Sequence, residues 1–119
     1  MFEIFVEHVF ASAHFLRNYK GKCENLHGHN YRVQVGMTGE LDPNGMLFDF
    51  ADLKQRLRTT SAYLDHQLIN DLKPFDTVNP SAENIAKFIF DEIQRDLEPA
   101  KLAYVRVWET DTSCAIYRR

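Results

Sequence analysis

The sequence lacks the features that would place it in several common classes of protein. Its 119 residues include only two cysteines, and no apolar run approaches the ~20 residues of a membrane-spanning helix. The start, from Met1 to Phe5, has neither the basic nor the apolar region of a signal peptide, so we expect a cytoplasmic protein with free thiols. The net charge is -3 with both signs interspersed, which gives no basic surface for nucleic acid. The net charge does not reveal a local basic pocket, so it is compatible with an anionic small substrate.

The composition is that of a single globular domain. Hydrophobic residues make up 45% and charged residues 26% of the chain, which is ordinary for a protein with one core. A chain of this length buries roughly two-thirds of its unfolded surface. The sequence contains no internal repeat, low-complexity tract or linker, so we expect one domain over residues 1–119.

Two stretches of alternating residues predict long strands. From Phe2 to Phe15 the even positions are mostly apolar and include His8 and His14. From residue 27 to residue 38 the odd positions carry the apolar side chains together with both histidines of that stretch. An antiparallel pair is the simplest arrangement of two strands joined by one loop, and each strand then carries its histidines on its apolar face.

Turn and cap residues predict the next elements. Asp42-Pro43-Asn44-Gly45 predicts a tight turn, and Met46-Leu47-Phe48 a short returning strand. Asp49 is expected to cap a helix whose apolar residues recur at helical spacing. Asn79-Pro80 predicts the start of a second helix, with Asn79 as its cap and an end marked by Pro99.

The last part of the chain predicts a hairpin, with strands over 102–110 and 112–118. The order of elements predicts an α+β fold, with one antiparallel sheet and two helices that are inserted between the strand pairs and cover one face. Both faces of the hairpin carry large side chains, with Val105, Val107 and Glu109 on one and Tyr104, Arg106 and Trp108 on the other. A second face this aromatic is often covered by another subunit, so we expect a homo-oligomer.

The stretch Cys23-Glu24-Asn25-Leu26-His27-Gly28-His29 carries the main chemical signal. In extended backbone, residues i and i+2 point to the same face, so His27 and His29 can bind one metal ion. Zinc is preferred, because neutral imidazole suits it and a catalytic zinc takes three protein ligands and keeps one position open. His14 is the best third ligand, because it ends the first strand on the same face. His8 lies roughly 20 Å further along an extended strand, and we interpret it as a partly buried, hydrogen-bonded side chain.

Cys23 has three interpretations. It can be a fourth zinc ligand that closes a structural site, a buried inert thiol, or a catalytic base or nucleophile activated by a nearby cation. Its polar loop disfavours simple burial. Cys114, in the last predicted strand, is interpreted as a core or sheet residue.

Five further residues could contribute to a site. Asp65 and His66 are adjacent, and adjacent residues of a helix do not face each other, so cooperation between them requires the helix to end there. The residues alone favour a solvated acid beside a helix-end histidine. Glu109 is expected on the inward face of an apolar strand, so its carboxylate needs a partner or a ligand to be buried. Ser81 and Glu83 lie in the first turn of a helix, where capping explains both.

Together these motifs resemble the 6-pyruvoyl tetrahydropterin synthase and 6-carboxytetrahydropterin synthase family. The resemblance spans almost the whole chain and rests on Ala13-His14-Phe15, the stretch from Cys23 to His29, Leu64-Asp65-His66, Asn79-Pro80-Ser81-Ala82-Glu83 and Glu109-Thr110. The compact length and Met46-Leu47-Phe48-Asp49-Phe50 are most similar to the bacterial 6-carboxytetrahydropterin synthases of 7-deazaguanine (queuosine) biosynthesis.

The resemblance implies a tunnelling fold (T-fold), in which a trimer closes its sheets into a barrel and two trimers stack as a hexamer, with active sites at subunit boundaries. It implies that 7,8-dihydroneopterin triphosphate is converted to 6-carboxytetrahydropterin with loss of acetaldehyde and triphosphate. The implied roles are zinc binding by His14, His27 and His29, general base catalysis by Cys23, relay by Asp65 and His66, and pterin anchoring by Glu109. Ser81 and Glu83 are further candidates for substrate binding, and Arg17, Lys20 and Lys22 are loop candidates for the triphosphate.

Two other functions stay open. The family also contains 6-pyruvoyl tetrahydropterin synthases, which eliminate triphosphate without loss of carbon. Some members replace the cysteine with a glutamate-based motif, and the presence of Cys23 argues against that branch. A non-enzymatic module stabilised by zinc would instead use Cys23 as the fourth ligand.

Overall fold

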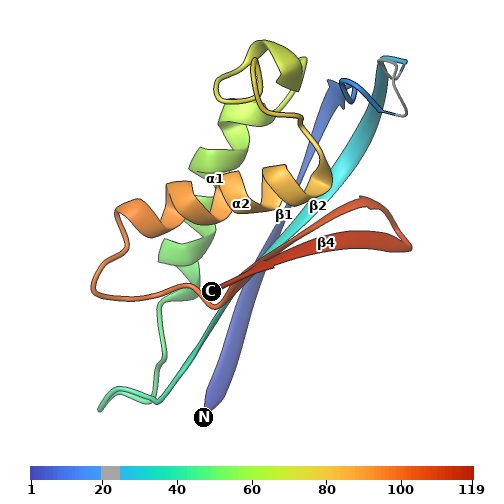
Figure 1. Ribbon diagram of the computed structural model, residues 1–119. Coiled ribbons are helices and arrows are strands. Elements are labelled where there is room, and N and C mark those ends of the chain that lie inside the picture. Colours follow the sequence, from blue (N-terminus) through green and yellow to red (C-terminus); the bar gives the residue numbers. More distant parts are fainter. Residues whose placement is uncertain (20–24) are drawn as a thin grey trace.

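The computed structural model describes residues 1–19 and 25–119 (Figure 1). Its elements are β1 (Phe2–His14), β2 (His27–Gly39), α1 (Phe50–Leu64), the short 3-10 helix η1 (Ile69–Asp71), α2 (Ala82–Arg95), β3 (Tyr104–Thr110) and β4 (Ser113–Arg118). The strands form one antiparallel sheet in the order β1-β2-β3-β4. The predicted α+β class, with two helices between the strand pairs, is confirmed.

The alternation of side chains sets the register of the long β1–β2 hairpin. The two strands pair along their whole length, from Phe2 opposite Gly39 to His14 opposite His27. Their inward positions, including Phe10 and Val33, are buried as the pattern predicts. The hairpin therefore carries every histidine of both strands on the face that also holds the core.

The two helices cover this same face of the sheet (Figure 1). Helix α1 packs on β1, and α2 packs on β3 and β4. Their buried residues recur at helical spacing: Leu53, Leu57 and Leu64 in α1, and Ile85, Ile89 and Ile93 in α2. Each such side chain contributes roughly 1.5–3 kcal/mol of burial free energy. No helix in the described part of the chain is both long enough and apolar enough to cross a membrane.

On the other face of the sheet there is no helix from the residues that the structure describes. Phe5 and Val9 of β1 are half exposed there, and the guanidinium carbon of Arg32 lies 3.8 Å from the centre of the Trp108 ring. Tyr104 is nevertheless buried, because its ring lies flat across the backbone of Gly36, its partner on β2. A Cβ atom at residue 36 would lie 2.2 Å from that ring, so only glycine fits the observed packing.

Two local predictions are wrong. Residues 46–48 form no strand, and Leu47 and Phe48 form bends. The Asp42 carboxylate accepts hydrogen bonds from the backbone N–H groups of Asn44 and Met46 and so removes them from any ladder. Helix α2 is capped by Ser81, whose hydroxyl accepts a hydrogen bond from the Asn84 N–H, and not by Asn79.

The end of α2 also differs from its prediction. The helix stops at Arg95, four residues before Pro99. The Gln94 amide then holds the following turn, because it donates to the Ala100 carbonyl and accepts from the Leu102 N–H. By contrast, the predicted caps and turns at Asp49 and at Asp42–Gly45 are confirmed.

Candidate metal centre and active site

The register of β1 and β2 gathers three imidazoles at one end of the hairpin. His14 lies directly opposite His27, and His29 is two residues further along β2 on the same face. The ring centres are 4.6 Å apart for His14 and His27, 5.2 Å for His14 and His29, and 4.8 Å for His27 and His29. Residues distant in sequence therefore converge as the spacing predicts. His8, further back on β1, is not part of this group.

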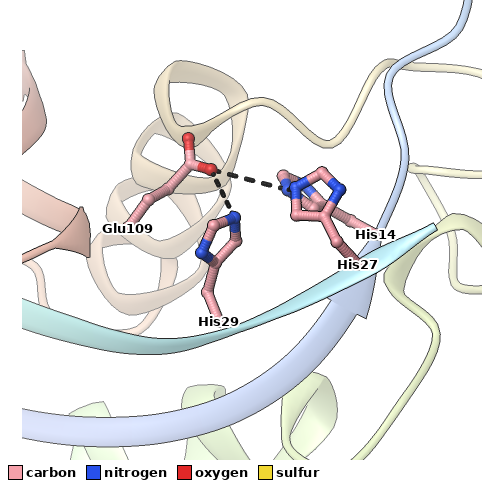
Figure 2. Close-up of side chains that lie close together, drawn as sticks. All are labelled: His14, His27, His29 and Glu109. Atoms are coloured by element: carbon pink, nitrogen blue, oxygen red, sulfur yellow. Dashed lines mark hydrogen bonds and ion pairs between the residues drawn. The ribbon is translucent and has the colours of Figure 1, made fainter. Parts of the chain in front are cut away.

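Glu109 of β3 joins the three imidazoles, as Figure 2 shows. The pairing of β3 with β4 shifts between Trp108 and Thr110, an irregularity of the kind that re-aims a side chain. One oxygen of Glu109 lies 3.0 Å from Nε2 of His29 and 3.5 Å from Nε2 of His14. All four ligand atoms lie within 4.8 Å of one another. His14, His27, His29 and Glu109 are called the four-residue group below.

Backbone carbonyls fix the tautomers of two of the rings. Nδ1 of His14 lies 2.7 Å from the Pro80 carbonyl oxygen, and Nδ1 of His27 lies 2.8 Å from that of Asn25. A carbonyl oxygen only accepts hydrogen bonds, so each Nδ1 carries the hydrogen and each neutral ring points the lone pair of Nε2 inward. The two Nε2 atoms are 3.0 Å apart. Two lone pairs and a carboxylate so close together need a cation between them.

A divalent metal ion fits this set of donors. Three imidazole nitrogens and one carboxylate oxygen form a mixed nitrogen and oxygen set of the kind that zinc and other first-row ions bind. Outer hydrogen bonds from the rings to backbone carbonyls are also typical of metal-bound histidines. The predicted ligands His14, His27 and His29 thus form a site able to hold a metal ion, and Glu109 is a fourth potential donor that the sequence motif did not assign to the ion.

The imidazoles also change the charge state of Glu109. The hydrogen bond with His14 lowers the pKa of Glu109, partial burial raises it, and any positive charge carried by the imidazoles lowers it further. That hydrogen bond requires a protonated His14 ring, which places a positive charge where a metal ion would otherwise supply one. Glu109 is therefore ionised at neutral pH. Its side chain is 29% exposed, so the carboxylate is accessible at the edge of the group.

Asp65 and His66 form a pair immediately after α1. The helix ends at Leu64, Asp65 is extended, and His66 has a left-handed backbone with φ of 57°. This break brings Nδ1 of His66 to 2.9 Å from Oδ1 of Asp65, so the condition for cooperation, an end of the helix at this point, is met. The Ala11 N–H bound to Asp65 is the largest cause of the lowered pKa of that carboxyl, and His66 adds to it.

The Asp65–His66 pair lies against the backbone of β1, where Asp65 accepts from the Ala11 N–H and the His66 N–H donates to the Ala11 carbonyl. His66 lines a depression of about 540 Å³ beside the outer edge of β1. Ala11, Ala13 and Asn30 line the same depression, and so does His29 of the four-residue group. The side chain of His66 is 82% exposed. The pair is therefore not part of the four-residue group, but His29 borders the depression that His66 lines.

The remaining predicted site residues are placed as follows. Cys23, Lys20 and Lys22 lie outside the described residues. Ser81 caps α2, and Glu83 is exposed in the first turn of that helix. Arg17 is bound to the carbonyl oxygens of Asn70, Phe75 and Val78, which gives it a structural role.

Comparisons with known proteins agree with the fold and the site. The profile of the 6-pyruvoyl tetrahydropterin synthase family matches residues 3–119. The 6-carboxy-5,6,7,8-tetrahydropterin synthase of Haemophilus influenzae is 35% identical over 99% of both chains. The human 6-pyruvoyl tetrahydrobiopterin synthase is 40% identical over 82% of this chain and 71% of the human one. The structure of the Caenorhabditis elegans 6-pyruvoyl tetrahydropterin synthase superposes with a TM-score of 0.84 and 32% identity, covering 100% of this chain and 97% of that one.

These relatives are pterin synthases with a tunnelling fold, which is the class of protein that the sheet and the four-residue group define. The chain belongs to the 6-pyruvoyl tetrahydropterin synthase family. The resemblance identified from the sequence motifs is confirmed, as is the tunnelling fold.

Proposed function

We propose that the protein converts 7,8-dihydroneopterin triphosphate to 6-carboxy-5,6,7,8-tetrahydropterin, with release of acetaldehyde and triphosphate, in 7-deazaguanine (queuosine) biosynthesis in the cytoplasm. Similarity to the Haemophilus influenzae 6-carboxy-5,6,7,8-tetrahydropterin synthase over 99% of both chains supports this reaction. The observation that carries the proposal is the convergence of His14, His27, His29 and Glu109, because it provides the polar centre that such a reaction needs.

Zinc is the proposed metal, held by His14, His27 and His29. A bound zinc ion would act as a Lewis acid toward the hydroxyl groups of the pterin side chain. The protein's own contribution is to present the Nε2 lone pairs of His14 and His27, because both Nδ1 atoms are occupied by backbone carbonyls.

Glu109 is the proposed anchor of the pterin ring. An ionised carboxylate can accept two parallel hydrogen bonds, one from a ring N–H and one from the exocyclic amine. A carboxylate is ionised at neutral pH, so Glu109 is in the accepting form, and its partial exposure leaves it accessible. Ser81 and Glu83, at the start of α2, are proposed as further contacts for the substrate, since the Pro80 carbonyl links this helix start to His14.

Cys23 is proposed as the general base, with Asp65 and His66 as its relay. A thiolate near a cation can exist at neutral pH and remove a proton from the substrate side chain. Asp65 orients His66 through Nδ1, which leaves Nε2 for proton transfer. His66 is 82% exposed and is not part of the four-residue group, and we propose that it serves a site completed by a second copy of the chain.

The proposed assembly is a trimer or a hexamer. Phe5, Val9 and Ile116 are exposed on the face of the sheet that has no helices. Among the described strands, β1 and β4 each pair on one side only. Joining these edges between copies would satisfy their backbone groups and cover the apolar side chains.

The second candidate is a 6-pyruvoyl tetrahydropterin synthase, which the 40% identity to the human 6-pyruvoyl tetrahydrobiopterin synthase favours. Its product keeps all the carbon atoms of the side chain. Mass spectrometry of the products formed by the zinc-loaded protein from dihydroneopterin triphosphate separates the two reactions. A carboxylated pterin with acetaldehyde supports the proposal, a pyruvoyl product supports the second candidate, and intact substrate contradicts both.

A structural zinc module is the non-enzymatic alternative. Cys23→Ala distinguishes it, because the sulfur is a ligand in the module and a base in the enzyme. Zinc content unchanged with turnover reduced by roughly 10²–10⁴-fold supports the enzyme. Loss of zinc together with the thiol would instead identify a closed structural site.

A further inference from the structure

Two asparagines hold the backbone that follows β1. Asn70 accepts a hydrogen bond from the Phe15 N–H at 3.0 Å and donates to the Phe15 carbonyl at 2.9 Å. Asn79 likewise accepts a hydrogen bond from the Arg17 N–H at 2.7 Å and donates one to the Arg17 carbonyl at 2.9 Å. The two side chains therefore pair with alternate residues of the segment that follows β1.

These amides replace a missing strand. A primary amide offers one N–H and one C=O side by side, as a neighbouring strand would. Strand β2 begins opposite His14, so no described strand pairs with residues 15–17. Without the two asparagines, four partly buried backbone groups of Phe15 and Arg17 would lose their partners.

Arg17 in turn binds the backbone between η1 and α2 with its side chain. Its guanidinium donates to the carbonyl oxygen of Phe75 at 2.8 Å and to those of Asn70 and Val78 at 3.4 Å. The segment after β1 and the connection from η1 to α2 thus hold each other through both backbone and side chains. Arg17, Asn70 and Asn79 are called the clasp below.

The clasp is linked to His14 through one residue. Asn79 is followed by Pro80, and it is the Pro80 carbonyl that accepts the hydrogen bond from Nδ1 of His14. Proline fixes its own φ and restricts the residue before it, so the direction of this carbonyl follows from where Asn79 is held. On the other side, Asn84 donates to the Asn79 carbonyl at 3.0 Å and Ser81 begins α2.

We propose that the clasp is a positioning device for the metal centre, in which Asn79 fixes the Pro80 carbonyl so that His14 carries its hydrogen on Nδ1 and presents Nε2 to the ion. His14 is 1% exposed, so water cannot take over the role of that carbonyl. This inference rests on the proposed function only in that the ion is zinc. Loss of such an outer partner reduces metal affinity by roughly 10- to 100-fold.

Asn79→Asp tests the clasp with little change in volume. The carboxylate still accepts from the Arg17 N–H but has no hydrogen to donate to the Arg17 carbonyl. We expect zinc affinity, measured by competition with a chromophoric chelator, to fall by roughly 10-fold or more. In the metal-free protein at mildly alkaline pH, nitrogen–proton NMR correlations should show His14 as the Nδ1–H tautomer in the wild type and a mixture of tautomers in the variant.

Gln94→Glu is the matched control. Gln94 also holds a backbone turn with a side-chain amide, donating to Ala100 and accepting from Leu102, but at the far end of α2. The same chemical change there removes the donations to Ala100 and Glu98, and it should alter neither zinc affinity nor the His14 tautomer. A decrease in zinc affinity that is equal in both variants would reduce the clasp to a contribution to stability and overturn the inference.

Arg17→Met provides a second variant if Asn79→Asp does not fold. It keeps the side-chain stem and removes all three donations to the 70–78 carbonyls. We expect a smaller decrease in zinc affinity, in the same direction. Unchanged affinity and tautomer in every folded clasp variant would contradict the inference. Failure of the wild type to bind zinc or to convert the pterin would instead contradict the proposed function, while the tautomer measurement would still test the clasp.

Discussion

The Nε2 atoms of His14 and His27 lie 3.0 Å apart, although the residues are 13 positions apart in the sequence. Both rings have Nδ1 bound to a backbone carbonyl, so neither can turn its lone pair away without losing that bond. The cost of holding these acceptors together is relieved when a cation binds. Zinc binding should therefore stabilise the folded protein.

Zinc at 100 times its Kd is expected to stabilise the wild type by about 2.7 kcal/mol, which raises Tm by roughly 10 °C for a domain of this size. His27→Ala should abolish this increase, because it removes one of the converging donors. His8→Ala is the control, since His8 lies on the same strand face as His14 but outside the group, and it should keep the increase. Thermal unfolding with zinc and with EDTA, at one protein concentration, measures both. An increase retained in His27→Ala would contradict the site.

Glu109→Gln separates a pterin anchor from a metal ligand. The amide keeps the shape of the side chain but can accept fewer hydrogen bonds from the pterin and carries no charge. We expect zinc content to stay near the wild-type value and kcat/KM to fall by roughly 100-fold or more, corresponding to about 2.7 kcal/mol. Metal analysis and steady-state kinetics check this. Release of zinc by this single change would make Glu109 a fourth ligand.

Asp65 should contribute to stability in a defined range of pH. Its pKa is lowered in the folded protein, mainly by the Ala11 N–H and further by His66. The contribution is therefore present above the ordinary carboxyl pKa of about 4, and it is lost as pH falls through the lowered folded value. Urea unfolding from pH 5 downward in EDTA should show a larger loss of stability for the wild type than for Asp65→Asn. Parallel profiles would show that the contact with Ala11 does not favour the ionised form.

Gly36→Ala tests the packing of the uncovered face of the sheet. The added Cβ would meet the Tyr104 ring, whose hydroxyl donates to Gln34 at 3.0 Å, so the ring has to move and lose this bond. Overpacking of this kind costs roughly 1–3 kcal/mol. Thr38→Ala, on the same strand and exposed, should stay within about 0.5 kcal/mol of the wild type. Urea unfolding of the two variants compares them directly.

Much of the fold could be predicted from the sequence because its signals are local. Alternation over thirteen residues in each of β1 and β2 predicts two strands. The i, i+2 spacing of His27 and His29 predicts that both side chains lie on the same face of β2. The end of β1 at His14 then predicts the third imidazole. These features depend only on backbone periodicity, which neighbouring residues determine.

The features that the sequence did not predict depend on contacts between distant segments. Asn79 has the residue type of a helix cap, and its position before a proline reinforces that interpretation, yet its amide is bound to Arg17, 62 residues away in the sequence. Glu109 was expected to need a partner, but its place beside the imidazoles depends on the pairing of β3 with β2. No sequence motif indicates the role of the Pro80 carbonyl, because every residue has a backbone carbonyl.

The length of β1 places the start of the strand far from the candidate metal centre. The strand runs thirteen residues from Phe2 to His14, which at roughly 3.3 Å per residue places these two residues about 40 Å apart. Figure 1 shows the N-terminal end of β1 at the opposite end of the long hairpin from the end of β1 and the start of β2. A fluorophore or surface linker attached at Met1 would therefore leave the imidazoles clear, so titrations of the immobilised protein would report on the intact metal centre.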